Sequence, residues 1–179
     1  MKILLCGPPC SGKSTIAKLV ASRLGWEAID TDQIIEQEYQ REKGDIQSCR
    51  EIYKREGEKN FRKMENKALC SLKNEENVVI ALGGGVKETA FLQGEGVVIY
   101  LRATLDTLWK RILQRPQLPA YLAENNARKS FERLIEKRLP AYASMAEITI
   151  DTDSLTPEKV VDRICDTILI KEEVPHGIK

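Results

Sequence analysis

Short apolar runs alternate along the chain with segments in which apolar residues recur every three or four positions. The runs are typical of buried strands, and the segments are typical of amphipathic helices. Strands are predicted at residues 3–6, 26–31, 78–82, 97–101 and 148–150. Helices are predicted around residues 16–24, 34–39, 46–53, 58–72, 105–113, 131–139 and 157–169. This alternation predicts an α/β fold, a three-layer sandwich in which helices cover both faces of a five-stranded parallel sheet.

Capping residues and prolines indicate where several helices begin and end. Thr31 or Asp32 is expected to cap the second predicted helix, because a side-chain oxygen there can accept from a free backbone N–H. Pro140 is expected to end the helix at 131–139, since proline lacks the N–H that a helix uses. Residues 116–129 contain two prolines and show little periodicity. A mobile surface segment is predicted there.

The stretch Gly7–Thr15 fits the pattern G-x-x-x-x-G-K-[ST] and lies between the first predicted strand and the first predicted helix. In that setting, backbone N–H groups and a helix N-terminus point at one place and hold phosphate oxygens. Lys13 adds a positive charge, and Ser14 is a candidate magnesium ligand. The motif predicts binding of a nucleoside triphosphate and leaves the phosphate acceptor open. The loop residues expected to hold the nucleotide are Cys10, Ser11, Gly12, Lys13, Ser14 and Thr15.

Composition narrows the class of partner. A chain of 179 residues with 42% hydrophobic and 31% charged residues is typical of one globular domain, and its net charge of +1 argues against a nucleic-acid or membrane surface. No apolar run approaches the roughly 20 residues of a membrane span, and the first apolar run is too short for a secretory signal. Five cysteines without a C-x-x-C pair indicate reduced thiols. We expect a cytoplasmic monomer whose partner is a small molecule.

Two further clusters follow predicted strands. Asp30 and Asp32 stand at the end of the second strand, and Gly83–Gly85 follow the third. Because ligands of parallel sheets bind beyond the carboxyl ends of the strands, both clusters are expected on one rim with the phosphate loop. Two carboxylates beside a polyphosphate repel it unless a metal or a substrate hydroxyl intervenes, which favours a functional role. Three glycines after a strand indicate close approach of the backbone to another group more often than a plain turn.

Two arginines have no assigned role from spacing alone. Arg62 and Glu65 are three residues apart on a predicted helix, so they are neighbours, and a solvated surface pair is the simpler interpretation. Arg138 lies beside the apolar stripe of its helix. It either extends to solvent and complements the helix C-terminus, or it meets an anion.

Together these segments resemble one family, the shikimate kinases. The resemblance covers residues 2 to about 170, with the motifs in the family's order. The matching motifs are the phosphate loop, Asp30-Thr31-Asp32, Gly57-Glu58 through Phe61-Arg62 to Glu65, Gly83-Gly84-Gly85, Arg115-Pro116 and Arg138-Leu139-Pro140-Ala141-Tyr142. The resemblance implies a kinase that uses ATP and Mg²⁺ to phosphorylate the 3-hydroxyl of shikimate, giving shikimate 3-phosphate in aromatic amino-acid biosynthesis.

The resemblance also implies one kinase domain over residues 1–179, with a substrate-binding helical segment at about 32–73 and a lid at about 116–129. Two alternatives stay open. Another small-molecule kinase, such as a gluconate or nucleoside monophosphate kinase, is disfavoured by the paired arginines and the triple glycine. A nucleotide-binding module without catalysis is disfavoured by the intact phosphate loop and the two aspartates.

Residue roles on the acceptor side follow from the resemblance. Arg62 and Arg138 are expected to grip the carboxylate of shikimate, with Glu65 orienting Arg62. Asp32 is expected to accept the proton of the acceptor hydroxyl. The residues implied to bind shikimate are Asp32, Arg62, Gly83, Gly84, Gly85 and Arg138.

Roles on the nucleotide side are implied in the same way. Lys13 and Arg115 would stabilise the transferring phosphoryl group, although the lid differs in length from the family's and makes Arg128 a rival to Arg115. Ser14, and Asp30 through a water molecule, would hold magnesium. Asp30 and Asp32 are expected to project to the same side of an extended strand. The residues implied to border the adenine are Arg111, Asp153 and Ser154.

Overall fold

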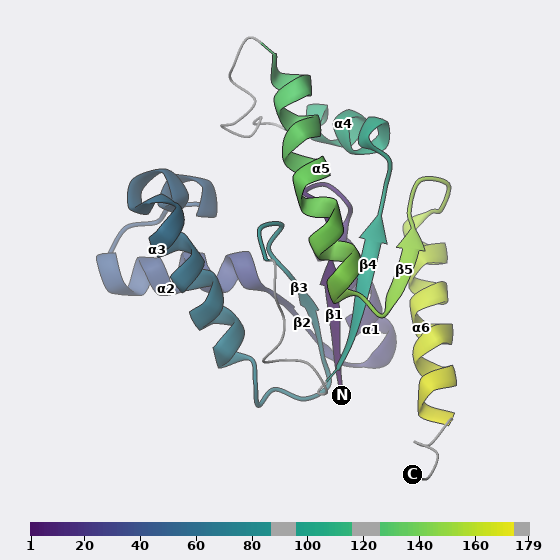
Figure 1. The fold of residues 1–179 in the computed structure, drawn as a ribbon. Helices are drawn as coiled ribbons and strands as arrows, with labels where there is room; N and C mark the ends of the chain where they lie inside the picture. Colours follow the sequence, from purple (N-terminus) through teal and green to yellow (C-terminus); the bar gives the residue numbers. More distant parts are fainter. Residues whose placement is uncertain (87–95, 116–125, 174–179) are drawn as a thin grey trace.

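The computed structural model of the chain describes residues 1–86, 96–115 and 126–173. Its five strands form one parallel sheet in the order β2-β3-β1-β4-β5, as Figure 1 shows. The strands are β1 (Lys2–Cys6), β2 (Glu27–Asp30), β3 (Val78–Ala81), β4 (Gly96–Arg102) and β5 (Ile148–Asp151). The predicted α/β fold with a five-stranded parallel sheet is confirmed.

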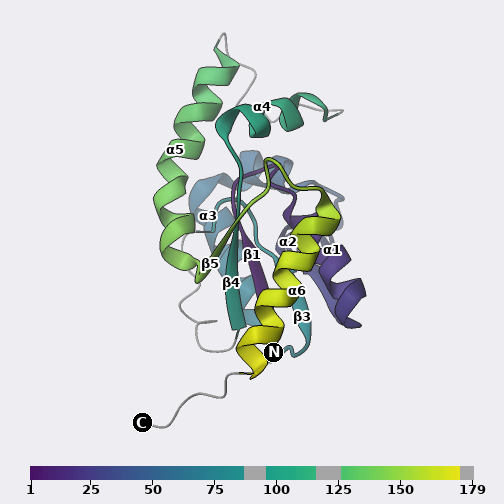
Figure 2. The same cartoon turned by 90° about the vertical axis from the view of Figure 1, so that its right-hand side faces the viewer.

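The described residues form six helices around this sheet. They are α1 (Lys13–Leu24), α2 (Thr31–Lys43), α3 (Cys49–Ser71), α4 (Leu105–Leu113), α5 (Ala127–Met145) and α6 (Pro157–Glu173). Figure 2 shows α1 and α6 on one side of the sheet and α5 on the other. This is the predicted three-layer arrangement, and α6 begins at Pro157 as the sequence indicates.

Alternation along the strands explains the two faces. Ile3 and Leu5 of β1 belong to the apolar cluster that includes α1 and α6, whereas Leu4 and Cys6 belong to the cluster that includes α5 and the end of α3. Both faces of the central strand are therefore buried, which explains the apolar run of residues 3–6 within β1. Smaller apolar clusters join α2 to α3 and α4 to α5.

The cap of α2 differs from the prediction. The N-cap is Asp30, whose side chain accepts from the backbone N–H of Asp32 at 3.0 Å, so neither Thr31 nor Asp32 caps the helix. Strand β2 ends at Asp30 and the helix begins at Thr31. The expectation that Asp30 and Asp32 project from one extended strand is therefore wrong, because Asp32 is a helical residue.

The two helices predicted at 46–53 and 58–72 lie on either side of a kink at Gly57, and together they make up α3. Gly57 has φ 77° and ψ 168°, a conformation that residues with a Cβ rarely adopt. A capping box of Ser48 and Glu51 begins the helix at residue 49. Ile46, expected on the first helix, lies before it and is 79% exposed.

Pro140 lies inside α5 and does not end it, contrary to the prediction. Beyond the proline, Tyr142 and Met145 are buried against the sheet, and the Tyr142 hydroxyl donates to the carbonyl of Gly84. These contacts hold the last turns of the helix despite the missing N–H.

The lid predicted at about 116–129 lies mostly outside the described residues, so it stays a prediction there. Its last three residues, 127–129, belong to α5, so that part of the predicted lid is wrong. Within the part of the chain that the structure describes, no helix is long and apolar enough to cross a membrane.

Candidate active site

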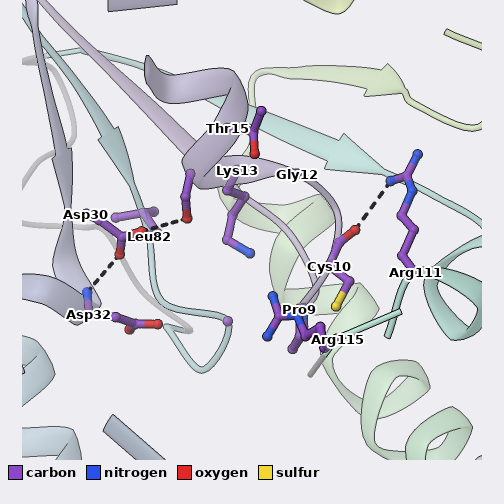
Figure 3. A pocket seen from close by; sticks show the side chains of 12 residues that line it. Pro9, Cys10, Gly12, Lys13, Thr15, Asp30, Asp32, Leu82, Arg111 and Arg115 are labelled. Atoms are coloured by element: carbon purple, nitrogen blue, oxygen red, sulfur yellow. Dashed lines mark hydrogen bonds between the residues drawn. The ribbon is translucent and has the colours of Figure 1, made fainter. Parts of the chain in front are cut away.

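A cavity of about 370 Å³ opens beyond the carboxyl ends of the central strands. Figure 3 shows the phosphate loop, the two aspartates and the end of α4 around it. Its lining residues are Pro9, Cys10, Gly12, Lys13, Ser14, Thr15, Asp30, Asp32, Leu82, Gly84, Arg111 and Arg115. The prediction that these separate segments share one rim of the sheet is confirmed.

The phosphate loop presents a helix N-terminus to the cavity. Gly12 is the N-cap of α1 in a left-handed conformation with φ 96°, and no side chain caps the helix. The Lys13 ammonium donates to the carbonyls of Gly7 at 2.8 Å and Pro8 at 2.9 Å, so its side chain folds back over the loop. Uncapped N–H groups and a fixed cation are the features that bind phosphate oxygens. The loop therefore fits the polyphosphate of a nucleotide.

Ser14 and Asp30 meet at the edge of this loop. The Ser14 hydroxyl donates to Asp30 Oδ2 at 2.6 Å, and Figure 3 shows this bond beside the bond from the Asp32 N–H to Asp30. Hydroxyl and carboxylate oxygens suit Mg²⁺, which usually keeps several water ligands and binds substrate phosphates. No group of three or more metal-binding side chains occurs among the described residues. The pair fits a magnesium ion that is only partly held by protein.

Asp32 has an unusual carboxyl group. Burial raises its pKa from 3.8 to about 6, and the neighbouring negative charge of Asp30 acts in the same direction, while Lys13 opposes both. Burial conversely lowers the pKa of the Lys13 ammonium, against the attraction of Asp32 and Asp30. With a pKa near 6, Asp32 is a carboxylate at neutral pH and is basic enough to accept a proton.

The glycine turn of residues 83–85 lies against functional groups from three other elements. A methyl group on Gly83 would lie 2.7 Å from Asp32 Oδ1, and one on Gly84 would lie 3.2 Å from Pro9 Cδ of the phosphate loop. A methyl group on Gly85 would overlap the guanidinium of Arg62. The close approach predicted for the three glycines is therefore confirmed, and the turn lies between the phosphate loop, Asp32 and Arg62.

Two arginines reach this turn from different helices. The Arg62 guanidinium pairs with Glu65, as the spacing predicts, but Glu65 is buried, so the interpretation of a solvated surface pair is wrong. The Arg62 Nε is buried without a hydrogen-bond partner among the described residues. Arg138 on α5 donates to the carbonyl of Gly84 at 2.9 Å. Its guanidinium is therefore turned toward the glycine turn. Of the two interpretations of Arg138, the geometry fits an anion-binding role better than an extension to solvent.

Arg111 of α4 lines the cavity and connects the phosphate loop to the loop after β5. Arg111 donates to the carbonyl of Cys10 at 3.3 Å, drawn in Figure 3, and to Thr152 Oγ1 and O at 3.3 and 3.1 Å. Asp153 accepts from the backbone N–H of Thr104 at the start of α4. Ser154 is exposed and is not among the described residues that line the cavity. Its adenine contact stays a prediction.

The two rival arginines lie in different places. Arg115 follows α4 and lines the cavity. Arg128 is exposed on α5, where it pairs with Asp106 and with Glu132. Within the described ranges, only Arg115 of the two is brought to the cavity. Its contact with the transferring phosphoryl group stays a prediction.

Comparison with known proteins decides the family. A sequence model of the family described as shikimate kinase matches residues 9–169. The chain belongs to the shikimate kinase family. The shikimate kinase of Actinobacillus pleuropneumoniae serotype 5b is 38% identical over 170 residues, which are 93% of this chain and 94% of that protein. The shikimate kinase of Lactococcus lactis is 36% identical over 168 residues, which are 92% and 96% of the two chains.

A solved structure of the family matches in fold as well. Shikimate kinase from Acinetobacter baumannii, solved in complex with shikimate, has a TM-score of 0.80 and 30% identity to this chain. The match covers 95% of this chain and 93% of that chain. The order of elements around the cavity is therefore that of the shikimate kinase family.

Sequence reasoning missed several residues that support the site in this member of the shikimate kinases. The Tyr142 hydroxyl holds the Gly84 carbonyl, and Thr31 and Thr152 make buried hydroxyl contacts after β2 and β5. Tyr142 and Thr31 lie inside the motifs that match the family, and this position is the sequence signal that indicates them. Thr152 has no such signal, because its partner Arg111 is distant in sequence.

Proposed function

We propose that this chain transfers the γ-phosphoryl group of ATP to the 3-hydroxyl of shikimate, giving ADP and shikimate 3-phosphate. The observation that carries the proposal is the glycine turn of residues 83–85. It touches the phosphate loop through Pro9 and touches Asp32 and Arg62 on its other sides. A phosphate donor site and a polar acceptor site are thereby built against each other, as in-line phosphoryl transfer needs.

The acceptor side suits a small molecule that carries a carboxylate and hydroxyl groups. Arg62 and Arg138 approach the turn from α3 and α5, and the Arg62 Nε is a buried donor without a partner among the described residues. Planar guanidinium groups bind carboxylates through paired hydrogen bonds. We assign the shikimate carboxylate to these two arginines. Glu65 fixes Arg62 in place.

Asp32 is the group that takes the proton of the acceptor hydroxyl. Its pKa of about 6 lies close to the working pH, where a general base is most effective. It borders both the phosphate loop and Gly83. The same carboxylate orients the hydroxyl, and orientation counts as much as basicity when the transition state is loose.

The cations of the loop side stabilise the charge on the phosphoryl oxygens. Lys13 is held over the loop by the carbonyls of Gly7 and Pro8 and lines the cavity, and Arg115 lines it after α4. Ser14 and Asp30 are the residues that would hold Mg²⁺. When bound, Mg²⁺ neutralises part of the charge on the nucleotide phosphates. Arg111 borders the nucleotide, together with the backbone around Asp153.

The proposal extends to the state of the protein in the cell. We infer a monomer in a reducing, cytoplasmic compartment. The five cysteines are all unpaired in the structure, which agrees with such a compartment. Light scattering coupled to size-exclusion chromatography should give one species near 20.3 kDa.

An ADP-release assay of the purified protein tests the substrate assignment. Shikimate, gluconate, AMP and CMP are offered separately with ATP and Mg²⁺. ADP release should depend on shikimate and be negligible with AMP and CMP, because these lack the carboxylate for which Arg62 and Arg138 are placed beside Asp32. Gluconate carries a carboxylate, so it tests whether the site also selects the ring of shikimate, and its turnover should be far lower. Equal or greater turnover with AMP or CMP would overturn the substrate assignment and leave the fold intact.

A further inference from the structure

Two buried threonines occupy equivalent places at opposite edges of the sheet. Thr31 directly follows β2 and Thr152 directly follows β5, which are the two edge strands. Their exposed fractions are 2% and 4%. Each hydroxyl donates to the carbonyl of the last residue of the neighbouring strand, at 3.3 Å to Ala81 of β3 and at 3.1 Å to Arg102 of β4. The two contacts have the same form although the segments differ in sequence.

Each hydroxyl also accepts a bond from a segment that borders the cavity. Thr31 accepts from the backbone N–H of Gly83 at 2.8 Å, and Thr152 accepts from the guanidinium of Arg111 at 3.3 Å. Among side chains of this size, only a hydroxyl both donates and accepts in this way. Valine has nearly the same shape and can do neither. The two threonines therefore link strand ends to two different parts of the site.

The Thr31 hydroxyl fixes the glycine turn next to Asp32. The ladder between β2 and β3 ends at the pair Asp30 and Ala81, where the chain turns into α2. The Thr31 hydroxyl takes the place of the next rung and fixes Gly83. A methyl group on Gly83 would lie only 2.7 Å from Asp32 Oδ1, so the turn and the carboxylate are in close contact. If the glycine turn moved, the side of the cavity next to Asp32, where the acceptor hydroxyl is held, would move with it.

Thr152 fixes Arg111 next to the phosphate loop. Arg111 donates to both the hydroxyl and the carbonyl of Thr152, and to the carbonyl of Cys10 in the phosphate loop. Thr152 is itself held to Arg102 by its backbone N–H at 2.8 Å. Arg111 is thus fixed between the loop after β5 and the phosphate loop. Loss of the Thr152 hydroxyl would free one side of that guanidinium.

We propose that Thr31 and Thr152 are positioning residues that each serve one substrate, Thr31 the phosphate acceptor and Thr152 the nucleotide. Neither is among the described residues that line the cavity, so both act through a neighbour. The identities of the two substrates rest on the proposed function. The division between the two sides rests on the hydrogen bonds of the two threonines and on the close contact of Gly83 with Asp32.

Steady-state kinetics of matched variants test this division. Thr31→Val should raise the KM for shikimate and lower kcat, together on the order of tenfold in kcat/KM, the effect of one lost buried hydrogen bond at a critical group. Its KM for ATP should stay within about twofold. Thr152→Val should show the reverse, a KM for ATP raised by about fivefold to tenfold with the KM for shikimate kept. Thr31→Ser and Thr152→Ser keep the hydroxyl and should restore wild-type values.

A third threonine supplies the control. Thr167 on α6 donates its hydroxyl to the carbonyl of Arg163 at 2.7 Å, away from the cavity. Thr167→Val should leave both KM values unchanged. Melting temperatures alone do not decide, because Thr31→Val and Thr152→Val each leave buried polar groups unpaired and should both melt earlier.

Two results would overturn the division. One is a similar rise in both KM values for Thr31→Val and for Thr152→Val, and the other is failure of the serine variants to restore them. If the wild-type protein does not phosphorylate shikimate, the proposed function fails, and two measurements without turnover decide the division. Hydrogen exchange of the Gly83 amide should be about tenfold faster in Thr31→Val and unchanged in Thr152→Val. The affinity for ATP measured by calorimetry should fall in Thr152→Val and stay unchanged in Thr31→Val. Unchanged values in both experiments would contradict the division between the two threonines.

Discussion

The nucleotide side and the acceptor side of the cavity are built in different ways. The phosphate loop is one continuous stretch, residues 7–15, whose shape follows from a strand, a left-handed glycine and a helix N-terminus. The acceptor side is assembled from the start of α2, the middle of α3, the glycine turn of residues 83–85 and α5. Local backbone conformation specifies the first, and contacts between distant segments specify the second.

Charge also differs between the two sides. Lys13, Arg111 and Arg115 give the nucleotide side an excess of positive charge. The acceptor side places Asp32 near Glu65, and both the burial of Asp32 and the negative charges around it raise its pKa. The nucleotide side is thus suited to attract a polyanion. The acceptor side is suited to orient one molecule and to remove a proton from it.

The largest expected effect separates the two aspartates. Asp32→Asn should lower kcat on the order of 10²-fold or more, because the proton acceptor is lost while the shape of the side chain is kept. Its dependence on magnesium concentration should be nearly unchanged. Initial rates over a range of shikimate and Mg²⁺ concentrations measure both quantities.

Asp30→Asn is the matched variant on the nucleotide side. Because Asp30 accepts from Ser14, this change should raise the magnesium concentration needed for half-maximal rate. Excess magnesium should then restore much of the activity. If excess magnesium instead repairs Asp32→Asn, the two roles are the reverse of those assigned here.

A second large effect distinguishes the two rival arginines. Arg115→Ala should lower kcat by about 10²-fold, the typical loss when one group that stabilises transition-state charge is removed. Arg128→Ala should keep kcat, since Arg128 is exposed and paired with Asp106 and Glu132. Loss of those surface pairs costs at most about 1 kcal/mol of stability. A larger kcat defect in Arg128→Ala would assign the phosphoryl contact to Arg128.

An intermediate effect tests the carboxylate site. Arg138→Ala should raise the KM for shikimate by about tenfold to 10²-fold, since a charge-assisted hydrogen bond contributes about 1.5–3 kcal/mol. ATP affinity and melting temperature should change little, and Arg138→Lys should restore binding only in part. Arg133→Ala, an exposed arginine on the same helix, is the control. A protein that unfolds while its folded fraction keeps a normal KM would show a structural role for Arg138.

The smallest effect is a pH dependence. With the pKa of Asp32 raised to about 6, kcat/KM for shikimate should fall as pH drops through 6, by about tenfold per pH unit below it. Asp32→Asn should lack this decline. Because the pKa is raised above 3.8, protonation of Asp32 also stabilises the fold. That contribution is present below about pH 4 and is lost as pH rises through 6, so at neutral pH Asp32→Asn should melt later than wild type.

The sequence predicted the fold because the patterns that specify it are local. Apolar runs such as 78–82 match strands to within a residue or two, and Pro157 begins α6 as expected. The predicted helix end at Pro140 is wrong, because the buried contacts of Tyr142 outweigh the local preference of proline. The apolar repeats at 46–53 and 58–72 predict two helices, and the backbone leaves the helical conformation between them at Gly57.

The sequence indicates which residues come together at the site better than it indicates how they are arranged there. The family's motifs predict that Asp32, Arg62 and Arg138 lie at one site. The three glycines after a strand predict that the turn closely approaches other groups. The sequence could not show that Asp32 belongs to a helix, because β2 ends one residue before the expected cap. It also could not choose between Arg115 and Arg128, whose partners lie on other elements. Such choices depend on tertiary contacts, which no local pattern encodes.

Phosphorus NMR of the products tests the proposed reaction most directly. Wild-type protein is incubated with ATP, Mg²⁺ and shikimate, and the spectrum is followed over time. A phosphomonoester signal coupled to the proton on carbon 3 of shikimate should grow in equal amount with ADP, and neither should form when shikimate is omitted. ADP formed without a new ester, or an ester on another hydroxyl, would contradict the assignment of the acceptor site.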